Sequence, residues 1–382
     1  MHILSERSNI KKGLERKIKK TEVDKVRVIA LYLPQFHPTP NNDRWWGKGF
    51  TEWINVCKAR KLFQGHYQPH VPADLGFYDL RLNESRIAQA EMAKEYGVEG
   101  FCYYHYWFGN GKRELERPFQ EVLESGEPDF PFMLCWANES WHAKFWNING
   151  ISQKKLLIEQ EYGGIEDYTK HFYSLLPAFK DPRYLKVENK PMFMIYRPLD
   201  FPEVAFFIDL WQKLAKENGL PGLFFIGQTT IFEENSVEIF SKRFDAINTI
   251  RHYDIVKYTN RIKRAFQKLY RIIFRTPFVH KYAAAKKYFI VESDKQENVI
   301  PTILPNWDHT PRSGNGGFVL TDSSPRLFGQ VVREAVKAVK EKPQDKRIIF
   351  IKSWNEWGEG NHMEPDLMFG KGYLEELKNN LK

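Results

Sequence analysis

The chain has 382 residues and a formal net charge of +9, and 15% of its residues are aromatic. About 250 residues suffice for one α/β barrel, so a single domain with insertions accounts for this length. An apolar run of about eighteen residues, which a membrane-spanning helix needs, is absent, and so are a glycine-rich phosphate loop and a Walker lysine. These absences argue against a membrane-spanning protein and against a nucleotide-binding protein of the P-loop type.

The N-terminus and the cysteines indicate a compartment. The first residues, MHILSERSNIKKGLERKIKK, are basic but lack the apolar stretch of a signal peptide. The three cysteines, Cys57, Cys102 and Cys135, are few and odd in number, and the last two lie in predicted strands as buried free thiols. We therefore expect a cytoplasmic protein.

Eight short apolar segments have the length and the β-branched or aromatic content of buried strands. In chain order they span residues 26–33, 98–104, 132–136, 191–196, 223–227, 244–249, 299–305 and 347–354. Helices are predicted between them, at residues 86–96 after an N-cap at Asn83, and at 114–124, 165–179, 202–218, 324–340 and 373–381. This alternation predicts a single (β/α)₈ barrel over residues 25–382, preceded by a basic arm at 1–24.

Polar and aromatic residues follow nearly every predicted strand. The first strand is followed by a long aromatic loop, residues 39–82, which we expect to be functional rather than disordered. In α/β barrels the active site lies at the C-terminal ends of the strands. Candidate site residues are therefore sought at these ends.

The richest strand end follows the eighth strand. Trp354, Asn355, Glu356, Trp357 and Glu359 occur within six residues, with glycines that permit a turn. Two carboxylates in different surroundings can act as acid and base on a glycosidic bond, and indole rings pack well on sugars. The alternative is that the two glutamates cap a helix and the tryptophans belong to the core.

Other candidates are weaker. Glu139, in WANES after the third strand, and Asp308, in NWDHTPR after the seventh, are rival carboxylates, with substrate binding or a turn as their alternatives. The histidines and cysteines have no diagnostic metal-ligand spacing, so no metal is expected. A DXD pattern typical of metal-dependent nucleotide-sugar transferases is not evident.

The segment from Lys257 to Lys287 contains ten basic residues and no acidic one, interleaved with apolar residues. A basic amphipathic helix is typical of a membrane-surface contact. An outer barrel helix with a solvated basic face is an equal alternative. Nucleic acid is not expected as a partner, because no recognised binding motif accompanies the charge.

Several stretches together resemble one known family. They are IALYLPQFHP, WWGKGFTEW, GFCYYHYWF, LCWANESW, EQEYGG, KDPRY, ILPNWDHTPR and SWNEWGEGNHMEPD. In this order they resemble the WbsX-like proteins of bacterial surface-polysaccharide clusters, which are often called glycosyltransferases. These are similar to glycoside hydrolase family 99, the endo-α-mannosidases and endo-mannanases.

The resemblance implies a (β/α)₈ barrel without metal or cofactor and retaining chemistry on an α-linked sugar. By motif position, Glu356 would deprotonate the sugar's 2-hydroxyl, and Glu359 would be acid and then base at the leaving oxygen. Substrate contacts are expected from strand-end residues and from the motif itself. They are Tyr32, Gln35, His37, Trp46, Glu52, Tyr104, Trp136, Asn138, Glu139, Tyr196, Asp308, Trp354, Asn355 and Trp357.

Three functions follow. The first is an enzyme that cleaves or transfers α-glycosidic linkages of a bacterial surface polysaccharide, a lipopolysaccharide O-antigen or capsule, or of its precursor. The second is a donor-dependent glycosyltransferase. The third is a non-catalytic glycan-binding barrel, which would not need an acid and base pair. The basic segment at 257–287 would suit lipid-linked glycans at the inner membrane face.

Overall fold

The computed structural model describes residues 25–146 and 152–381. The predicted basic arm at 1–24 lies outside the described residues. None of the described helices is both long and apolar enough to cross a membrane.

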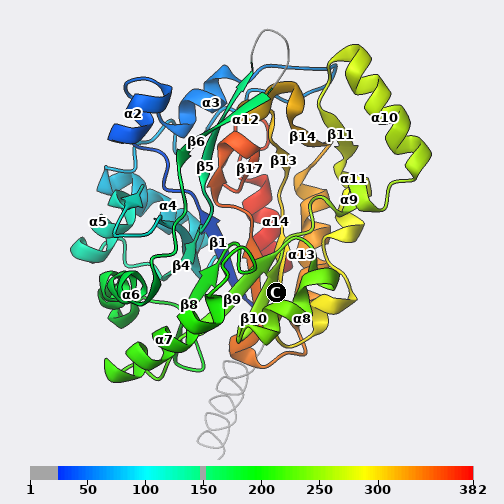
Figure 1. Ribbon diagram of the computed structural model, residues 1–382. Helices are drawn as coiled ribbons and strands as arrows, with labels where there is room; N and C mark the ends of the chain where they lie inside the picture. The colour runs from blue at the N-terminus through cyan, green and yellow to red at the C-terminus, as the bar shows by residue number, and fades with distance from the viewer. Residues whose placement is uncertain (1–24, 147–151, 382) are drawn as a thin grey trace, which may run out of the picture.

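The core of the fold is a closed barrel of eight parallel strands, drawn in Figure 1. In chain order the strands are β1 (Arg27–Tyr32), β2 (Gly100–Trp107), β4 (Phe132–Trp136), β8 (Lys190–Ile195), β9 (Phe224–Thr229), β10 (Ala246–Thr249), β12 (Val299–Ile303) and β15 (Ile348–Ile351). Consecutive strands are neighbours, and β1 closes the ring by pairing with both β2 and β15. The predicted (β/α)₈ barrel and its eight strands are thereby confirmed.

Helices cover the outside of the barrel. They are α4 (Asn83–Glu95), α5 (Arg117–Ser125), α6 (Gly164–Lys180), α7 (Val204–Glu217), α8 (Phe232–Ser241), α13 (Pro325–Val339) and α14 (Gly372–Asn380). In α13 the Ser324 hydroxyl accepts a hydrogen bond from the Leu327 amide, Pro325 occupies the first turn, and one face of the helix is buried. Local capping and a single apolar face thus explain why this segment is helical and where it lies.

Two predicted helix starts differ from the structure by three residues. The second predicted helix begins at Arg117 instead of residue 114, because Glu114 pairs with β2 as part of the short strand β3 (Arg113–Glu114) and Leu115 has a positive φ of 56°. Asn83 is the first residue of α4, and Leu82 holds the capping position without a side-chain hydrogen bond.

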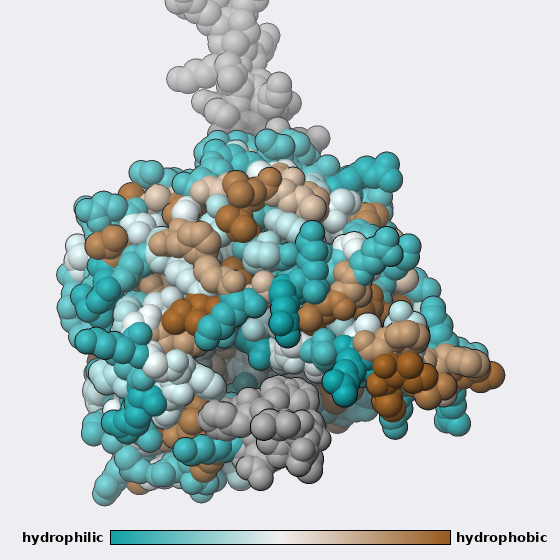
Figure 2. Space-filling model, turned by 90° about the horizontal axis from the view of Figure 1, so that it is seen from above, coloured by the Kyte–Doolittle hydropathy of each residue, from teal (hydrophilic) through white to brown (hydrophobic). Residues whose placement is uncertain are grey.

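Further elements decorate the C-terminal end of the barrel. The long loop at 39–82 contains the helices α2 (Pro40–Trp46) and α3 (Glu52–Lys58), and a hairpin of β5 (Trp141–Trp146) and β6 (Ser152–Ile158) follows β4. A small sheet combines β11 (Phe278–Lys281), β13 (Trp307–Asp308) and β14 (Phe318–Thr321). The helix α10 (Arg261–Phe274) projects from the body, and Figure 2 shows a brown apolar patch on this projection at the right of the view from above.

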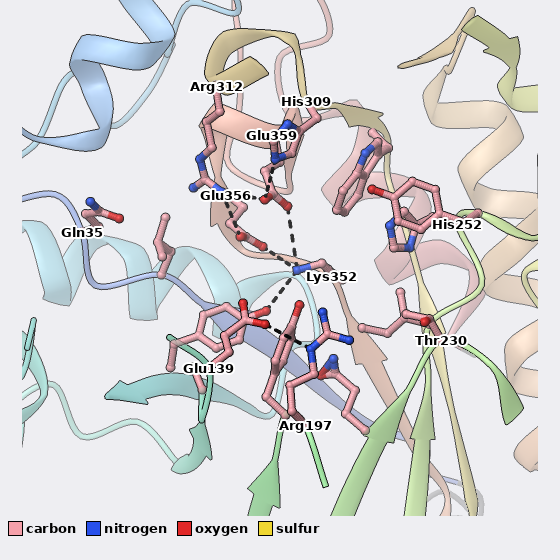
Figure 3. Close-up of a pocket in the computed structure, with 18 of the residues that line it drawn as sticks. Gln35, Glu139, Arg197, Thr230, His252, His309, Arg312, Lys352, Glu356 and Glu359 are labelled. Atoms are coloured by element: carbon pink, nitrogen blue, oxygen red, sulfur yellow. Dashed lines mark hydrogen bonds and ion pairs between the residues drawn. The ribbon is translucent and has the colours of Figure 1, made fainter. Parts of the chain in front are cut away.

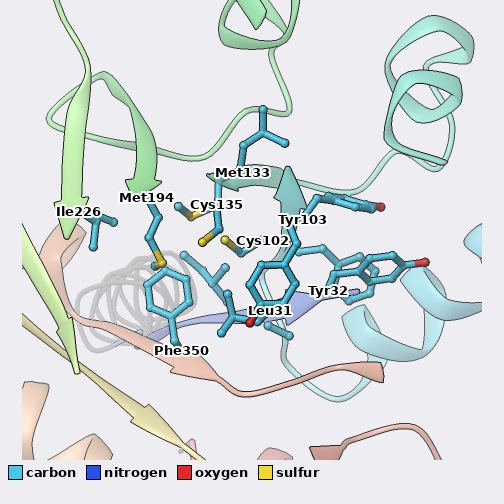
Figure 4. Packing of buried hydrophobic residues seen from close by; sticks show 14 of the residues in the cluster. Leu31, Tyr32, Cys102, Tyr103, Met133, Cys135, Met194, Ile226 and Phe350 are labelled. Atoms are coloured by element: carbon cyan, nitrogen blue, oxygen red, sulfur yellow. The ribbon is translucent and has the colours of Figure 1, made fainter. Parts of the chain in front are cut away.

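Apolar side chains fill the barrel interior. Figure 4 shows Leu31, Cys102, Cys135, Met194 and Phe350 gathered there from five different strands, and all five are fully buried. Cys102 and Cys135 are free thiols, as the sequence predicted. This packing closes the interior below the C-terminal face and leaves that face for a site.

Candidate active site

A cavity of about 360 Å³ opens at the C-terminal ends of the barrel strands. Its walls come from the loops after most of the strands, and Figure 3 shows their side chains pointing into it. The lining residues include Gln35, Tyr104, Glu139, Trp141, Tyr196, Arg197, Gln228, His252, Trp307, His309, Arg312, Lys352, Glu356 and Glu359.

The segment after β15 is held by hydrogen bonds to the end of β1. The Trp354 amide donates to the Leu31 carbonyl at 2.8 Å. The Asn355 side chain accepts from the Leu33 amide at 2.7 Å and donates to the Leu33 carbonyl at 3.0 Å. The Glu356 amide donates to the hydroxyl of Ser353. These bonds fix the backbone up to Glu356, whose carboxyl lines the cavity.

Two glycines, one between the glutamates and one directly after them, shape this turn for different reasons. Gly360 has a φ of 61°, a left-handed conformation that suits glycine. Gly358 provides space instead, because a Cβ there would lie 1.6 Å from Glu52 Oε1 and 3.0 Å from Arg312 Nε. The backbone at Gly358 therefore allows the Glu52–Arg312 ion pair to lie against it.

The two carboxyl groups share two cations, as the dashed contacts in Figure 3 show. Lys352 Nζ lies 2.8 Å from Glu356 Oε2 and 4.0 Å from Glu359 Oε2. Arg312 Nη1 lies 2.6 Å from Glu359 Oε1 and 3.7 Å from Glu356 Oε1. Arg312 Nε also donates to Glu52 at 2.8 Å. Two cations thus face three carboxyl groups, which favours one proton within the cluster.

The pKa values of the two glutamates move in opposite directions. Burial and the neighbouring Glu359 carboxylate raise the pKa of Glu356, and they outweigh the opposing effects of Lys352 and Arg312. Burial also acts to raise the pKa of Glu359, but Arg312, His309 and Lys352 outweigh it and hold this pKa well below its usual range. These opposite shifts favour Glu356 as the carboxyl that holds a proton and Glu359 as the one that is ionised.

This order is the reverse of the one that the resemblance implies, in which Glu356 is the base. The physical reason is the placement of Arg312, which contacts Glu359 more closely than Glu356. Lys352 contacts Glu356 more closely, but at this fully buried position it does not offset the cost of burying a second negative charge.

Other lining groups suit a polar ligand. Burial and Lys352 lower the pKa of His252 to about 3, so its ring is neutral. Both of its buried ring nitrogens lack a hydrogen-bond partner among the described residues, and so does Gln228 Oε1. At the rim, Arg197 Nε donates to Glu139 at 3.0 Å. Trp307 adds an aromatic surface, and its ring centroid lies 3.9 Å from that of His252.

The structure brings together six of the residues that the sequence singled out. Those that line the cavity are Gln35, Tyr104, Glu139, Tyr196, Glu356 and Glu359. The Tyr104 hydroxyl accepts a hydrogen bond from Lys352 Nζ at 3.0 Å, so it helps to position that cation. Substrate contact by these residues stays a prediction.

Several expected contact residues lie behind the cavity wall instead. Trp354 and Trp357 are fully buried, and Trp357 Nε1 donates to Glu364 at 2.6 Å. Tyr32 donates to Gln89, whose amide in turn donates to Glu364. These side chains, with Asn355 as described above, form a buried network that supports the motif, because the turn folds them toward the barrel rather than the cavity.

The remaining expected residues brace neighbouring loops. Asp308 accepts from His66 and Gln68, each at 2.7 Å, and Asn138 bonds to the backbone of Arg197. None of these contacts reaches the cavity. Glu52 forms an ion pair with Arg312, and His37 is hydrogen-bonded to the Pro34 carbonyl. Trp136 packs in a buried aromatic cluster, and Trp46 lies at the surface on α2.

Sequence reasoning missed Lys352, Arg312 and His252. All three follow a barrel strand or its extension, so their position at strand ends was a usable signal. Arg312 stands in a motif from which only Asp308 was selected. His252 follows the sixth strand and had no motif to mark it.

One cluster outside the cavity has the residue types of a metal site: His70, His362 and Asp366, all buried. The Glu364 carbonyl accepts from His362 Nδ1 at 2.8 Å, so His362 Nε2 accepts in turn from His70 Nδ1 at 2.9 Å. Burial lowers the pKa of His362 to about 4. The two nitrogens that face each other are thus paired without a cation, whereas His70 Nε2 has no hydrogen-bond partner among the described residues.

Comparison with known proteins adds the following. The profile of a family described as Glycosyltransferase WbsX matches residues 28–377. Two proteins from strains of Xanthomonas campestris pv. campestris, each called uncharacterized protein WxcX, are 34% identical over 350 residues, which is 91% of this chain and 48% of theirs. This chain thus spans about half the length of these relatives.

Solved structures share the fold. A glycoside hydrolase-like protein superposes with a TM-score of 0.60 at 16% identity and covers 94% of both chains. The GH99 endo-alpha-mannosidase from Bacteroides thetaiotaomicron gives a TM-score of 0.56 at 15% identity, with 93% of this chain and 96% of that chain covered. At this level of identity the likeness concerns the barrel and its closure.

Proposed function

The chain belongs to the WbsX glycosyltransferase family, and from this premise we propose that it cleaves or transfers α-glycosidic linkages of a bacterial surface polysaccharide or its precursor. Membership in this family indicates a carbohydrate-active enzyme. The observation that supports the finer proposal is the pair Glu356 and Glu359, which shares one cavity with opposite shifts of pKa.

The pair can perform both proton transfers of a retaining reaction. As the bond between C1 and the leaving oxygen breaks, protonated Glu356 gives its proton to that oxygen. Ionised Glu359 takes the proton of the sugar's 2-hydroxyl, whose oxygen bonds to C1. Water or an acceptor hydroxyl then attacks C1 and gives its proton to Glu356, while the bond between C1 and O2 breaks and Glu359 returns its proton to O2. Water gives hydrolysis, and a sugar hydroxyl gives transglycosylation.

The rest of the cavity suits a sugar. His252 and Gln228 have unsatisfied polar atoms that can bond to hydroxyl groups, and Trp307 presents an aromatic ring beside them. Arg312 and Lys352 hold the carboxylates in place and reduce the cost of their charge changes.

The cavity favours chemistry without a nucleotide donor. The described Lys and Arg residues that line it are Arg197, Arg312 and Lys352, and each has a carboxylate partner within 3.0 Å. A nucleotide sugar would bring a diphosphate toward these carboxylates, whereas a neutral glycan would not. Donor-dependent transfer is therefore the second candidate, supported by the family's description.

Product analysis tests the proposal. Wild type, Glu356→Gln and Glu359→Gln would be incubated with the native polysaccharide and its lipid-linked precursor, with and without a mixture of nucleotide sugars. Glu334→Gln, on the exposed surface of α13, is the matched control. We expect wild type and the control variant to produce shortened or rearranged glycans without any donor. Both cavity variants should fail to form these products.

The other outcomes separate the alternatives. Extension of the glycan only with a nucleotide sugar would make the protein a donor-dependent transferase. Binding of the glycan by all variants without turnover under any condition would make it a binding barrel.

A further inference from the structure

The helix α10 differs from the barrel helices because none of its residues is buried. Its large apolar side chains are open to solvent, with exposed fractions of 67% for Ile262, 69% for Phe266 and 61% for Ile273. A helix that packs on a barrel buries one apolar face, as α13 does. α10 is therefore not the solvated outer barrel helix that the sequence left open as an alternative.

The exposed residues of α10 are sorted by face. Ile262, Phe266, Leu269 and Ile273 follow one another at helical spacings of four, three and four, so they form one apolar stripe. Basic residues occupy the opposite side of the helix. They are Arg261, Arg264 and Lys268, whereas Arg271 reaches toward the body of the protein, where its guanidinium carbon lies 5.0 Å from the centre of the Phe278 ring. The helix is thus amphipathic although it has no protein layer to cover its apolar side.

The stripe borders an open groove of about 650 Å³ between α10 and the body of the protein. Phe63 and Phe278 line the body side of the groove. Contiguous apolar surface of this kind marks a contact with a membrane or another molecule. Figure 2 shows it as the brown patch on the projection at the right.

Charge identifies the kind of partner. The segment at 257–287 carries ten basic residues and no acidic residue. Among the described residues, no carboxylate forms an ion pair with Arg264 or Lys268. A second copy of this chain would bring two such basic segments together and be repelled, whereas an anionic surface would be attracted.

We propose that α10 docks the protein on an anionic lipid surface. The apolar stripe enters the boundary between headgroups and acyl chains, and the basic side of the helix lies among the anionic headgroups. Phe63 and Phe278 line a groove that acyl chains can fill beside the stripe.

The orientation has a consequence for the cavity. Figure 1 shows α10 at the same end of the molecule as the β5–β6 hairpin and the short helix α12 (Thr310–Ser313), which carries Arg312. Docking through α10 would hold this end near the lipid surface, where a lipid-linked glycan could reach the cavity. This consequence rests on the proposed function, whereas docking itself does not.

Vesicle co-sedimentation of the full chain, without any glycan, tests docking separately from catalysis. Vesicles of phosphatidylcholine alone would be compared with vesicles that also contain phosphatidylglycerol. We expect binding to the anionic vesicles, weak binding to the neutral ones, and loss of binding at about 1 M salt, where the Debye length is about 3 Å.

Two double variants separate the faces. Arg264→Glu with Lys268→Glu should weaken binding by more than about 25-fold, since each lost basic residue accounts for about fivefold. Phe266→Ser with Ile273→Ser should weaken it about tenfold or more for each residue. Phe206→Ser and Lys216→Glu, at exposed positions on α7, are the matched controls and should bind as wild type. Circular dichroism checks that every variant is folded.

Three results would overturn the proposal. The first is unchanged vesicle binding by both α10 variants. The second is equal binding to neutral and anionic vesicles. The third combines two observations: light scattering shows a wild-type dimer that the double variant Phe266→Ser with Ile273→Ser converts to a monomer, and neither wild type nor variant binds vesicles. This result would assign the apolar stripe to contact with a second copy of the chain.

Discussion

Lys352 Nζ lies 2.8 Å from Glu356 Oε2, and both side chains are buried at the C-terminal end of β15. A buried carboxylate that loses its cation is left with an uncompensated charge, which costs about 3 kcal/mol or more. The contact therefore links the stability of the protein to the charge of its candidate active site.

We expect Lys352→Met to lower the free energy of unfolding by about 3 kcal/mol at pH 8. The loss should be smaller at pH 5, because acid favours the protonated form of Glu356, whose pKa is raised by burial and by Glu359, and this form does not need the cation. Urea unfolding at the two pH values measures both. The control Lys337→Met, at an exposed ion pair on α13, should change stability little. An equal loss of stability at both pH values for Lys352→Met would contradict the link between stability and the charge of Glu356.

The pH profile tests the assignment of acid and base. Activity should fall at low pH as Glu359 becomes protonated. This fall should occur at a pH below the usual carboxyl range, because Arg312 lowers the pKa of Glu359 by more than burial raises it. Activity should also fall at high pH as Glu356 loses its proton. This fall should occur at a pH above the usual carboxyl range, because burial and Glu359 raise the pKa of Glu356. Glu356→Gln should remove the high-pH limb and keep the low-pH limb.

A substrate with an activated leaving group tests the same assignment independently. A leaving group that needs no proton should restore much of the roughly 10²–10⁴-fold loss in Glu356→Gln, and little of the loss in Glu359→Gln. The reverse result would support the order implied by family 99, and would mean that bound substrate moves the proton from Glu356 to Glu359.

Glu364 should make the stability of the protein depend on pH. Burial, against the hydrogen bonds from Trp357, Gln89 and Tyr78, raises its pKa from 4.5 to about 7. The folded state therefore binds a proton more tightly than the unfolded state, so this contribution is complete below about pH 4.5 and is lost as pH rises through 7. The change amounts to about 3 kcal/mol.

Glu364→Gln should flatten this dependence, because the amide cannot ionise. Urea unfolding of the variant and wild type between pH 4.5 and 8 measures the slope. Glu341→Gln, at an exposed position beyond α13, should keep the wild-type slope. A wild-type slope in Glu364→Gln would show that another group carries the dependence.

Gly358→Ala should disrupt the Glu52–Arg312 ion pair, because the new Cβ would lie 1.6 Å from Glu52 Oε1. We expect a loss of about 1–3 kcal/mol in stability, as for other overpacked sites, and reduced activity through displacement of Arg312 from Glu359. A double-mutant cycle with Glu52→Ala supplies the control: Glu52→Ala removes the clash, so Gly358→Ala should cost clearly less in that background. Additive losses would refute the steric account.

The strands and the glutamate pair could be predicted because their signals are local. A run such as Ile348–Ile351 is buried on both faces in any parallel barrel, and the residues that follow it must lie at the C-terminal face. The start of α5 was misplaced because Glu114 is drawn into a strand pair with β2. That pairing is a tertiary contact, which overrides local helix preference.

The sequence by itself determined the barrel, its strand order along the chain, and the location of Glu356 and Glu359 at one strand end. Only the tertiary structure decided which carboxyl holds the proton, because Arg312 reaches Glu359 from 47 positions away and Glu52 reaches Arg312 from 260 positions away. It also decided that Trp354 and Trp357 support the motif from behind, whereas Trp307 lines the cavity. Burial and charge contacts between distant segments set these properties, and spacing along the chain does not encode them.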